Sequence, residues 1–452
     1  MRWLACVLAV AACAPTRSEL RAPVDRELAR RLGGPVATQL TSEIAALLGK
    51  PLTRDSAVKI ALANNARLSA ALAELGIAGG DLASALAPGP LDIDVLARFG
   101  SGGAHEVEID AIQNVIGLIP APRERAAARA ELAAARAAAT ATALGIAARA
   151  EIAFDDVIAA QQELELRRTA FDAADAAAVV RERMHAAGNA TDLEQALDRD
   201  AREQARIDLA RAEADIEIRR EQLNAVLGLS GDQTKWTAAG TLGELPAAPP
   251  ALDDLEQAAV AASLDLAAGR ARVASAENTV GAERVRAWLP ELGVGVSAIE
   301  QGEGIEVGPA LRIGIPLFDQ RSGPRARARA TLAKAESELT AAAVELRANA
   351  RAARIAALAA YQEARHLRDI VLPLRQQIVD QTLLHYNAMN ATTFDLIAAH
   401  RSLADAGHQY LDALHRYWNA MSRIGALRRG VDLGATQMPG RSTSAPSAPE
   451  LH

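Results

Sequence analysis

Two short segments, LGVGVSAIE (292–300) and VGPALRIGIPLF (307–318), decide how this chain folds. In both of them apolar residues alternate with glycine, serine or polar residues, which is the two-residue period of a β-strand, and Gly302 and Gly304 supply a turn between them. From there to Gly430 the chain forms two long tracts with very few glycines or prolines, as expected of helices. We therefore predict a strand pair that leads into a very long helical hairpin.

The same order of patterns occurs about 200 residues earlier in the chain. Residues 91–99 alternate with apolar side chains on one face and mostly charged ones on the other, and the returning segment alternates in the same way. The chain is thus predicted to be mostly α-helical with a small β part, as one helix–strand–strand–helix–helix unit made twice. The predicted boundaries are a first repeat at 52–229, a linker at 230–250, a second repeat at 251–430 and a disordered tail at 431–452.

The expected helices have matching lengths in the two halves, which favours long parallel rods. The long helices span roughly 95–100 Å at 1.5 Å per residue, and Pro373 should bend the second of them. Hydrophobic residues make up 50% of the chain but aromatic residues only 3%, because alanine dominates, and small side chains let helices pack closely. The expected helices are 53–87, 123–187 and 190–227 in the first half, and 252–287, 325–388 and 392–429 in the second.

The N-terminus resembles the start of a bacterial lipoprotein. Arg2 gives a positive start, a short apolar run follows, and Val10-Ala11-Ala12 stands directly before Cys13. In lipoproteins such a cysteine is acylated with groups such as palmitate and becomes the first residue of the mature chain. We therefore predict a lipoprotein signal peptide at 1–12, lipidation of Cys13 and an N-terminal tether at 13–51 with one helix. An ordinary secretory signal is the alternative.

The sequence also argues against several classes of protein. The formal net charge of −7 at pH 7 disfavours nucleic acid as a partner, and no apolar run after the signal is long enough for a transmembrane helix. We find no GxSxG, HExxH, Walker or GxGxxG motif, so we predict neither an enzyme nor a cofactor. His400, His408 and His415 share roughly one helix face, but their spacing is longer than the usual three or four residues, so no metal site is predicted.

The number of strands has a consequence for the oligomeric state. A strand with one apolar face and one water-facing polar face fits a transmembrane barrel. The strand ends carry the aromatic residues Phe99, Trp288 and Phe318, which suit either an interfacial aromatic belt or ordinary packing. Four strands cannot close a barrel, since small barrels need about eight, and an open edge is not tolerated in lipid. If the strands enter a membrane, several copies must share one barrel, which predicts a homo-oligomer.

Three degenerate motifs accompany the repeated order of elements: Leu52-Thr53…Ala57…Ala61-Leu62…Asn64-Asn65, Leu223-Asn224-Ala225-Val226-Leu227-Gly228 and Ile315-Pro316-Leu317-Phe318. With these motifs, the order of elements over residues 52–430 resembles the TolC-like outer-membrane efflux family. The resemblance implies a homotrimer in the outer membrane, with four strands per chain in one shared transmembrane β-barrel and the helices in one α-helical barrel across the periplasm. It further implies a passive exit duct for an inner-membrane pump, joined through a periplasmic adaptor.

The resemblance also implies gate residues at the two helical turns, which would form the periplasmic tip. The gate tyrosine of the family corresponds to Tyr386, and its constriction aspartate corresponds to Asp395, nine residues later. The gate arginine and the second aspartate of the best-known member are replaced here by Ala391 and Ala398. The ion-pair network of the gate is therefore incomplete, and Tyr386 also has the simpler reading of a side chain packed between helices.

In the first half, Thr191 and Asp192 match the corresponding threonine–aspartate pair of the family. A structural reading competes with a gate role, because an acid in the first turn of a helix favours the helix dipole whatever else it does. The resemblance predicts this pair at the pore constriction, and helix stabilisation is the alternative.

A lipid-anchored helical scaffold of the periplasm, without a pore, is the competing hypothesis. The acidic side chains of the first hairpin favour it, since they are costly anywhere in a membrane except in a wet lumen. The second hairpin favours the barrel, because it has Gly and Ser on one face and a clean apolar face opposite. The sequence does not identify the transported substrate, which is a drug, a metal or another compound.

Overall fold

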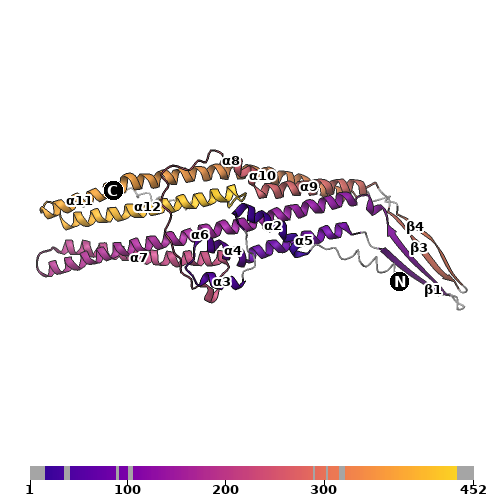
Figure 1. The fold of residues 1–452 in the computed structure, drawn as a ribbon, viewed down its shortest axis with the longest axis horizontal. Coiled ribbons are helices and arrows are strands. Elements are labelled where there is room, and N and C mark those ends of the chain that lie inside the picture. Colours follow the sequence, from indigo (N-terminus) through magenta and orange to yellow (C-terminus); the bar gives the residue numbers. More distant parts are fainter. Residues whose placement is uncertain are drawn as a thin grey trace, which may run out of the picture.

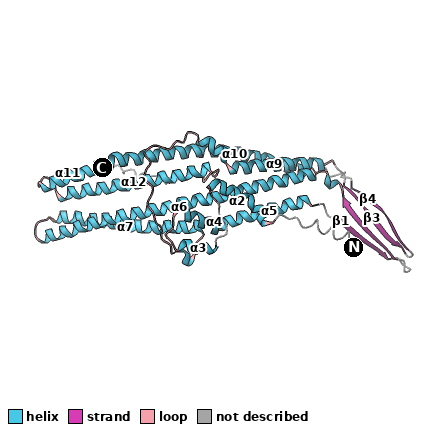
Figure 2. Cartoon of the chain, in the orientation of Figure 1, coloured by secondary structure: helices cyan, strands magenta, loops and turns pink. Residues whose placement is uncertain are grey.

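The computed structural model describes residues 16–34, 41–87, 91–99, 105–288, 291–301, 304–314 and 321–434. These residues form a long rod of helices with a small sheet at one end (Figures 1 and 2). The predicted fold class is confirmed, because long helices dominate, four strands form the sheet, and the element order of the first half returns in the second. Cys13, the signal segment, the Ile315–Phe318 motif and most of the predicted tail lie outside the described residues.

The elements follow the predicted order. The first unit runs through α4 (Arg54–Asn64), α5 (Ala66–Leu86), β1 (Leu91–Phe99), β2 (His105–Asn114), α6 (Ala121–Ala186) and α7 (Asp192–Leu227). The second runs through α8 (Leu255–Ala262), α9 (Leu264–Arg286), β3 (Glu291–Gln301), β4 (Gly304–Gly314), α10 (Ser322–His366), α11 (Leu372–Asn387) and α12 (Thr393–Arg428). Before both lie α2 (Arg17–Leu32) and α3 (Thr41–Leu48), so the segment expected to be a tether with one helix contains two.

The longest helical tracts of the two units match in length. Helix α6 has 66 residues, while α10, a π-helical turn at Leu367–Val371 and α11 follow one another without a break and have 45, 5 and 16 residues. Each tract spans roughly 100 Å. The π-helical turn lies directly before Pro373, where the sequence predicted a bend, and a wider turn accommodates the missing N–H of proline.

The helices before the strands are each broken once, so the prediction of unbroken helices at 53–87 and 252–287 is wrong. Asn65 separates α4 from α5, accepts from the N–H of Arg67 at 2.9 Å and donates to the Val226 carbonyl at 2.8 Å. Ser263 separates α8 from α9 in the same way. Asn and Ser side chains compete for backbone hydrogen bonds, so they start new helices rather than continue old ones.

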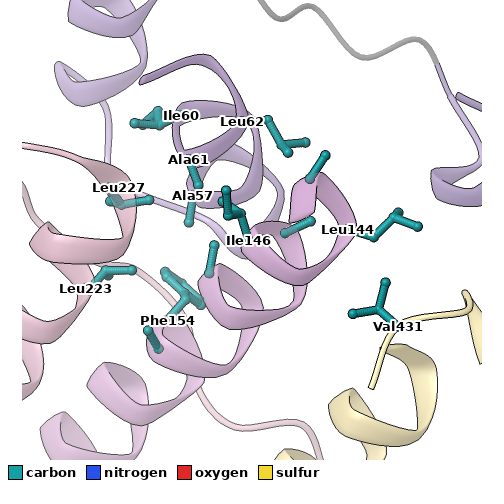
Figure 3. Packing of buried hydrophobic residues seen from close by; sticks show 14 of the residues in the cluster. Ala57, Ile60, Ala61, Leu62, Leu144, Ile146, Phe154, Leu223, Leu227 and Val431 are labelled. Atoms are coloured by element: carbon teal, nitrogen blue, oxygen red, sulfur yellow. The ribbon is translucent and has the colours of Figure 1, made fainter. Parts of the chain in front are cut away.

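The core is built around α6, which packs against α4, α5, α7, α9 and α12. Ala143, Ala147 and Ala150 of α6 are fully buried, and these small side chains let several helices approach the same one closely. Larger side chains fill the middle of the rod, where Leu223 of α7 and Ile60 of α4 lie beside α6 (Figure 3). The alanine-rich composition is thus explained by one central helix with many neighbours.

One helix in the described part of the chain, α6, is long and apolar enough to cross a membrane by length and composition alone. Its apolar stretch is 61% buried inside the structure. Neighbouring helices therefore cover this stretch, as expected for the central helix of a bundle.

The four strands form one antiparallel sheet in the order β1-β2-β3-β4. The register places Val95 opposite Ile109, Ile109 opposite Ala298, and Ala298 opposite Val307. The apolar positions of all four strands therefore share one face, and this face is exposed, with Val95 at 64% and Val307 at 68%. Strands β1 and β4 are the two edges of the sheet.

The opposite face of the sheet is charged and concave. Asp94 of β1 lies directly opposite Asp110 of β2 on this face. The Arg312 guanidinium on β4 reaches the Asp94 carboxylate across the two intervening strands. Because neighbouring strands lie about 4.8 Å apart, side chains on the first and fourth strands meet only when the sheet curls toward the face that carries them. The apolar face is therefore convex.

Two glycines of β3 permit this curvature. A Cβ atom on Gly295 would lie 2.0 Å from the Ala111 carbonyl oxygen, and one on Gly293 would lie 2.4 Å from Cγ2 of Ile112. Ile112 points to the concave face and is only 5% exposed, so it fills the space that the glycines leave. The close approach of β2 and β3 thus depends on the absence of side chains at these positions.

We predict that Gly295→Ala destabilises the sheet by about 1–3 kcal/mol or more, because the added methyl group overlaps backbone atoms that cannot move aside cheaply. The matched control is Gly308→Ala on β4, where a Cβ atom meets nothing within 4 Å in the described chain. The measurement is the thermal unfolding midpoint of each purified variant. Equal midpoints for the two variants would contradict the role given to Gly295.

Candidate functional site at the helical tips

The two helical turns lie together at the end of the rod opposite the sheet (Figure 1). In the first turn Gly188 has φ 77° and the Asn189 N–H donates to the Met184 carbonyl at 2.8 Å. In the second turn Met389 has φ 58° and the Asn390 N–H donates to the carbonyl of His385 at 2.8 Å. The two turns therefore have the same backbone form, and Met389 adopts the left-handed conformation that glycine favours.

Both return helices begin with a reciprocal capping motif. The Thr191 hydroxyl accepts from the Glu194 N–H at 3.2 Å, and the Glu194 carboxylate accepts from the Thr191 N–H at 2.8 Å. The Thr392 hydroxyl accepts from the Asp395 N–H at 3.2 Å, and the Asp395 carboxylate accepts from the Thr392 N–H at 2.8 Å. Each motif satisfies two backbone donors at the start of its helix. The Thr-x-x-acid spacing that forms both caps is visible in the sequence and would have predicted them.

The structure places all four predicted gate residues at this end of the rod, on two separate hairpins. Asp395 occupies the capping position that Glu194, and not Asp192, occupies in the first hairpin. The Asp192 side chain is 98% exposed, and its Oδ1 atom lies 2.7 Å from Nε2 of His185. Tyr386 is 39% exposed at the end of α11. Their role at a pore constriction stays a prediction.

The capping contacts explain the electrostatics of the acidic tip residues. The hydroxyl and the backbone N–H of Thr392 hold the pKa of Asp395 below its ordinary value. The backbone N–H and the hydroxyl of Thr191 lower the pKa of Glu194 in the same way. The ionised carboxylates also lie at the positive end of the helix dipole. Helix initiation therefore accounts for both acidic residues without a gate.

A buried ion pair that was not predicted from the sequence connects the two helices of the first hairpin near its tip. Nε of Arg181 on α6 lies 2.6 Å from Oδ2 of Asp198 on α7, with side chains only 7% and 5% exposed. The corresponding positions of the second hairpin are Thr382 and Ala399, which carry no charge. The two residues of the pair lie on either side of the turn, 17 positions apart, and no helical period connects them. The two side chains face each other once the predicted hairpin is folded about its turn, so the position of the turn could have identified the pair.

Large apolar side chains are exposed at both tips. Leu193 and Phe394 hold equivalent positions in the first turns of α7 and α12, with 69% and 53% exposure, and Met389 is 94% exposed. A gathering of exposed apolar side chains at one end of a molecule is typical of a contact surface for another protein. The tip therefore has the character of a docking surface.

The histidines of α12 pair with carboxylates of α6. Nδ1 of His408 lies 2.8 Å from Oε2 of Glu163, and Nε2 of His415 lies 2.6 Å from Oδ1 of Asp156. His400 instead lines a cavity of about 560 Å³ between α6, α7 and α12. Among the described residues no group of three His, Cys, Asp or Glu side chains is placed to hold a metal ion.

No protein-family model matches this chain. It is 28% identical over 393 residues to the cobalt-zinc-cadmium resistance protein CzcC of Cupriavidus metallidurans, covering 83% of this chain and 89% of that protein. Its structure is similar to the CmeC outer-membrane channel of Campylobacter jejuni, with a TM-score of 0.73 and 13% identity over 85% of this chain and 87% of that one. The outer-membrane protein VceC of Vibrio cholerae gives a TM-score of 0.69 and 17% identity over 84% and 96%.

The chain has the fold of the TolC-like outer-membrane efflux family. The resemblance seen in the sequence is thereby confirmed, including the predicted combination of long helices with a four-stranded sheet. The proteins that this chain resembles are outer-membrane channels and a resistance protein, a non-enzymatic family, which agrees with the prediction that the chain is not an enzyme.

We predict that Arg181→Met lowers the free energy of unfolding of the first hairpin by about 3–5 kcal/mol, because it leaves the Asp198 charge buried without a partner. The control is Arg199→Met, which removes an exposed ion pair with Glu182 worth about 0–1 kcal/mol. Hydrogen exchange of α7 measures the difference. A loss no larger than that of the control would show that the buried pair contributes nothing.

We predict that the carboxyl group of Asp395 titrates below its ordinary range and that Thr392→Ala returns it there, because the two hydrogen bonds favour the ionised form. Since the folded pKa is the lower one, the contribution to stability is present above the unfolded pKa and is lost as pH falls through the folded value. Carbon NMR of selectively labelled aspartate gives the titration. Identical titration in the parent and the variant would rule out the capping contact.

Proposed function

We propose that this protein is a trimeric exit duct of the outer membrane. Three copies share one transmembrane barrel, and their helices form one tunnel that extends into the periplasm. The duct conducts substrates passively, receiving them from an inner-membrane pump through a periplasmic adaptor. The observation that carries the proposal is the sheet, which has an exposed apolar convex face, a charged concave face and two unpaired edges at the end of a long rod.

The sheet supports the shared barrel through its shape and its number of strands. A transmembrane barrel needs an apolar outer face, a polar inner face and no free edge. The convex face of the sheet supplies the apolar outer surface, and the concave face supplies the polar inner surface. Four strands cannot close, since small barrels need about eight, whereas three copies supply twelve. The pore-free scaffold leaves both the edges and the exposed apolar face without a role.

The helices support the tunnel and its docking end. Tracts of roughly 100 Å run from the sheet to the tips, so a protein that meets the tips lies far from the outer membrane. The exposed Leu193, Met389 and Phe394 give the adaptor an apolar surface to contact. The chain itself needs no cofactor for this role, because passage is passive.

Metal cations are the cargo class that we propose. The relative CzcC is named for resistance to cobalt, zinc and cadmium, and the concave face of the first hairpin carries several carboxylates, among them Asp92, Glu106 and Glu108. An acidic pore lining raises the local concentration of cations. Lipidation of Cys13 also remains a proposal, and intact mass measurement of the mature protein tests it.

Neighbouring positions on β4 provide a matched test of the duct. Val307→Lys puts a charge on the convex face at a cost of about 2–4 kcal/mol per chain in the bilayer, so channels should not form. Gly308→Lys puts the same charge on the concave face, where it should leave insertion intact and reduce cation conductance. Planar-bilayer recordings of purified trimers give both results. Channels formed equally well by both variants, or none formed by the parent protein, would contradict the proposal.

A further inference from the structure

The guanidinium groups of three arginines near the start of α10 have no ionic or hydrogen-bonding partner within the described chain. Arg325, Arg327 and Arg329 lie within the first eight residues of the helix, with Arg327 and Arg329 exposed and Arg325 half-buried. None of their guanidinium groups makes an ion pair or hydrogen bond within the described residues. Cations near a helix N-terminus oppose the helix dipole, so these side chains weaken α10 unless an anion meets them.

The corresponding arginines of the first unit are used within the fold. At the start of α6, Arg123 donates to the Gly281 carbonyl at 3.2 Å and Arg125 donates to the carbonyl of Ala85 at 3.2 Å. These two bonds tie α6 to α9 and α5. The arginines of α10 have the same alternate spacing but no such bonds, so helix packing does not explain them.

Two of the nearby carboxylates are already paired. Glu283 of α9 accepts from Arg286 at 3.0 Å and from Arg321 at 3.1 Å, and Glu124 of α6 pairs with Arg286. Glu131 of α6 and Glu338 of α10 line the same cavity as Arg327, yet within the described residues no ion pair joins either of them to an arginine of α10.

The arginines lie at the junction between helices and sheet. Helix α10 begins shortly after β4 ends and packs against α9 (Figure 1). Trp288 follows α9, stands just before β3, and is 81% exposed. Exposed arginines without partners in the described chain also occur nearby at Arg129 and Arg284. The junction thus combines a basic surface with an exposed tryptophan, which is typical of a membrane interface.

We propose that Arg325, Arg327 and Arg329 bind the phosphate groups of anionic phospholipids in the periplasmic leaflet of the membrane. This inference rests on the proposed function, because it requires the sheet to cross the bilayer. The guanidinium group suits phosphate through paired N–H donors. A basic residue near an anionic surface strengthens lipid association about five-fold. The surface would select phosphatidylglycerol or cardiolipin over zwitterionic lipid and fix the depth of the barrel.

Trp288 reports on this surface directly. The full chain, with Trp3→Phe so that the apolar N-terminal segment carries no tryptophan, is reconstituted in vesicles of phosphatidylcholine that contain a brominated phospholipid, either phosphatidylcholine or phosphatidylglycerol, and tryptophan quenching is measured. Trp236 is buried and Trp418 donates to the Gly243 carbonyl in the middle of the rod, so bilayer lipids do not reach them. We expect phosphatidylglycerol to quench Trp288 at lower mole fractions, and the combined Arg325→Gln, Arg327→Gln and Arg329→Gln variant to lose about a hundred-fold in this preference, roughly five-fold for each arginine.

A charge-matched control separates a local effect from net charge. Arg199→Gln, Arg206→Gln and Arg211→Gln remove the same three charges from exposed positions on α7, far from the sheet, and should keep the preference. A free-anion site is distinguished by adding inorganic phosphate at the concentration of the anionic lipid. Loss of the preference under phosphate would overturn the lipid assignment.

The remaining outcomes separate the inference from the proposed function. No quenching of Trp288 by any brominated lipid would contradict the membrane position of the sheet itself. Equal quenching by both headgroups in the parent protein would leave the duct standing and overturn the lipid surface. Dissociation of the triple variant into monomers, without any prior lipid preference, would show that the arginines pair with a neighbouring copy instead.

Discussion

The unpaired backbone groups along the outer edges of β1 and β4 are the constraint on which the structure depends. Each N–H or C=O group without a partner costs several kcal/mol in lipid, so an edge strand is not tolerated there. The chain exposes an apolar face beside these edges, which is costly in water as well. In the shared barrel that we propose, β1 of one copy pairs with β4 of the next and lipid covers the apolar face, so both costs are removed. The helices attached to the strands are then brought into one ring.

The curvature of the sheet and the composition of the helices serve the same geometry. Gly293 and Gly295 let β2 and β3 approach closely, and the contact between Arg312 and Asp94 spans the concave face. In the rod, buried alanines let α6 take neighbours on several sides. Small residues therefore decide the shape of both the sheet and the rod, since they let backbones come together where larger side chains would hold them apart.

Much of the fold was predictable because its signals are local. Strand alternation, uninterrupted helical tracts and the repeated order can all be read within short windows of sequence. The break at Asn65 was missed because it depends on a hydrogen bond to Val226, which is distant in sequence. The buried pair of Arg181 and Asp198 was missed because the two residues lie on different helices, 17 positions apart across the first turn, where no helical period connects them.

The candidate site was predictable only in its position. The resemblance located Asp395 at the tip, but in the structure Asp395 caps the start of α12 together with Thr392. A pore constriction is formed between copies of a chain, so its residues leave no local pattern in one sequence. The curvature of the sheet likewise required the structure, because Arg312 and Asp94 belong to strands of different repeats.

Inter-chain disulfide formation between the sheet edges tests the shared barrel most directly. Cysteine is placed at Ile93 on β1 and in turn at successive positions of β4, and purified protein is oxidised in a bilayer. The account predicts that one register gives covalent dimers and trimers and nothing larger, because three chains close the ring. Only monomers at every position, or a ladder that continues beyond three chains, would contradict it.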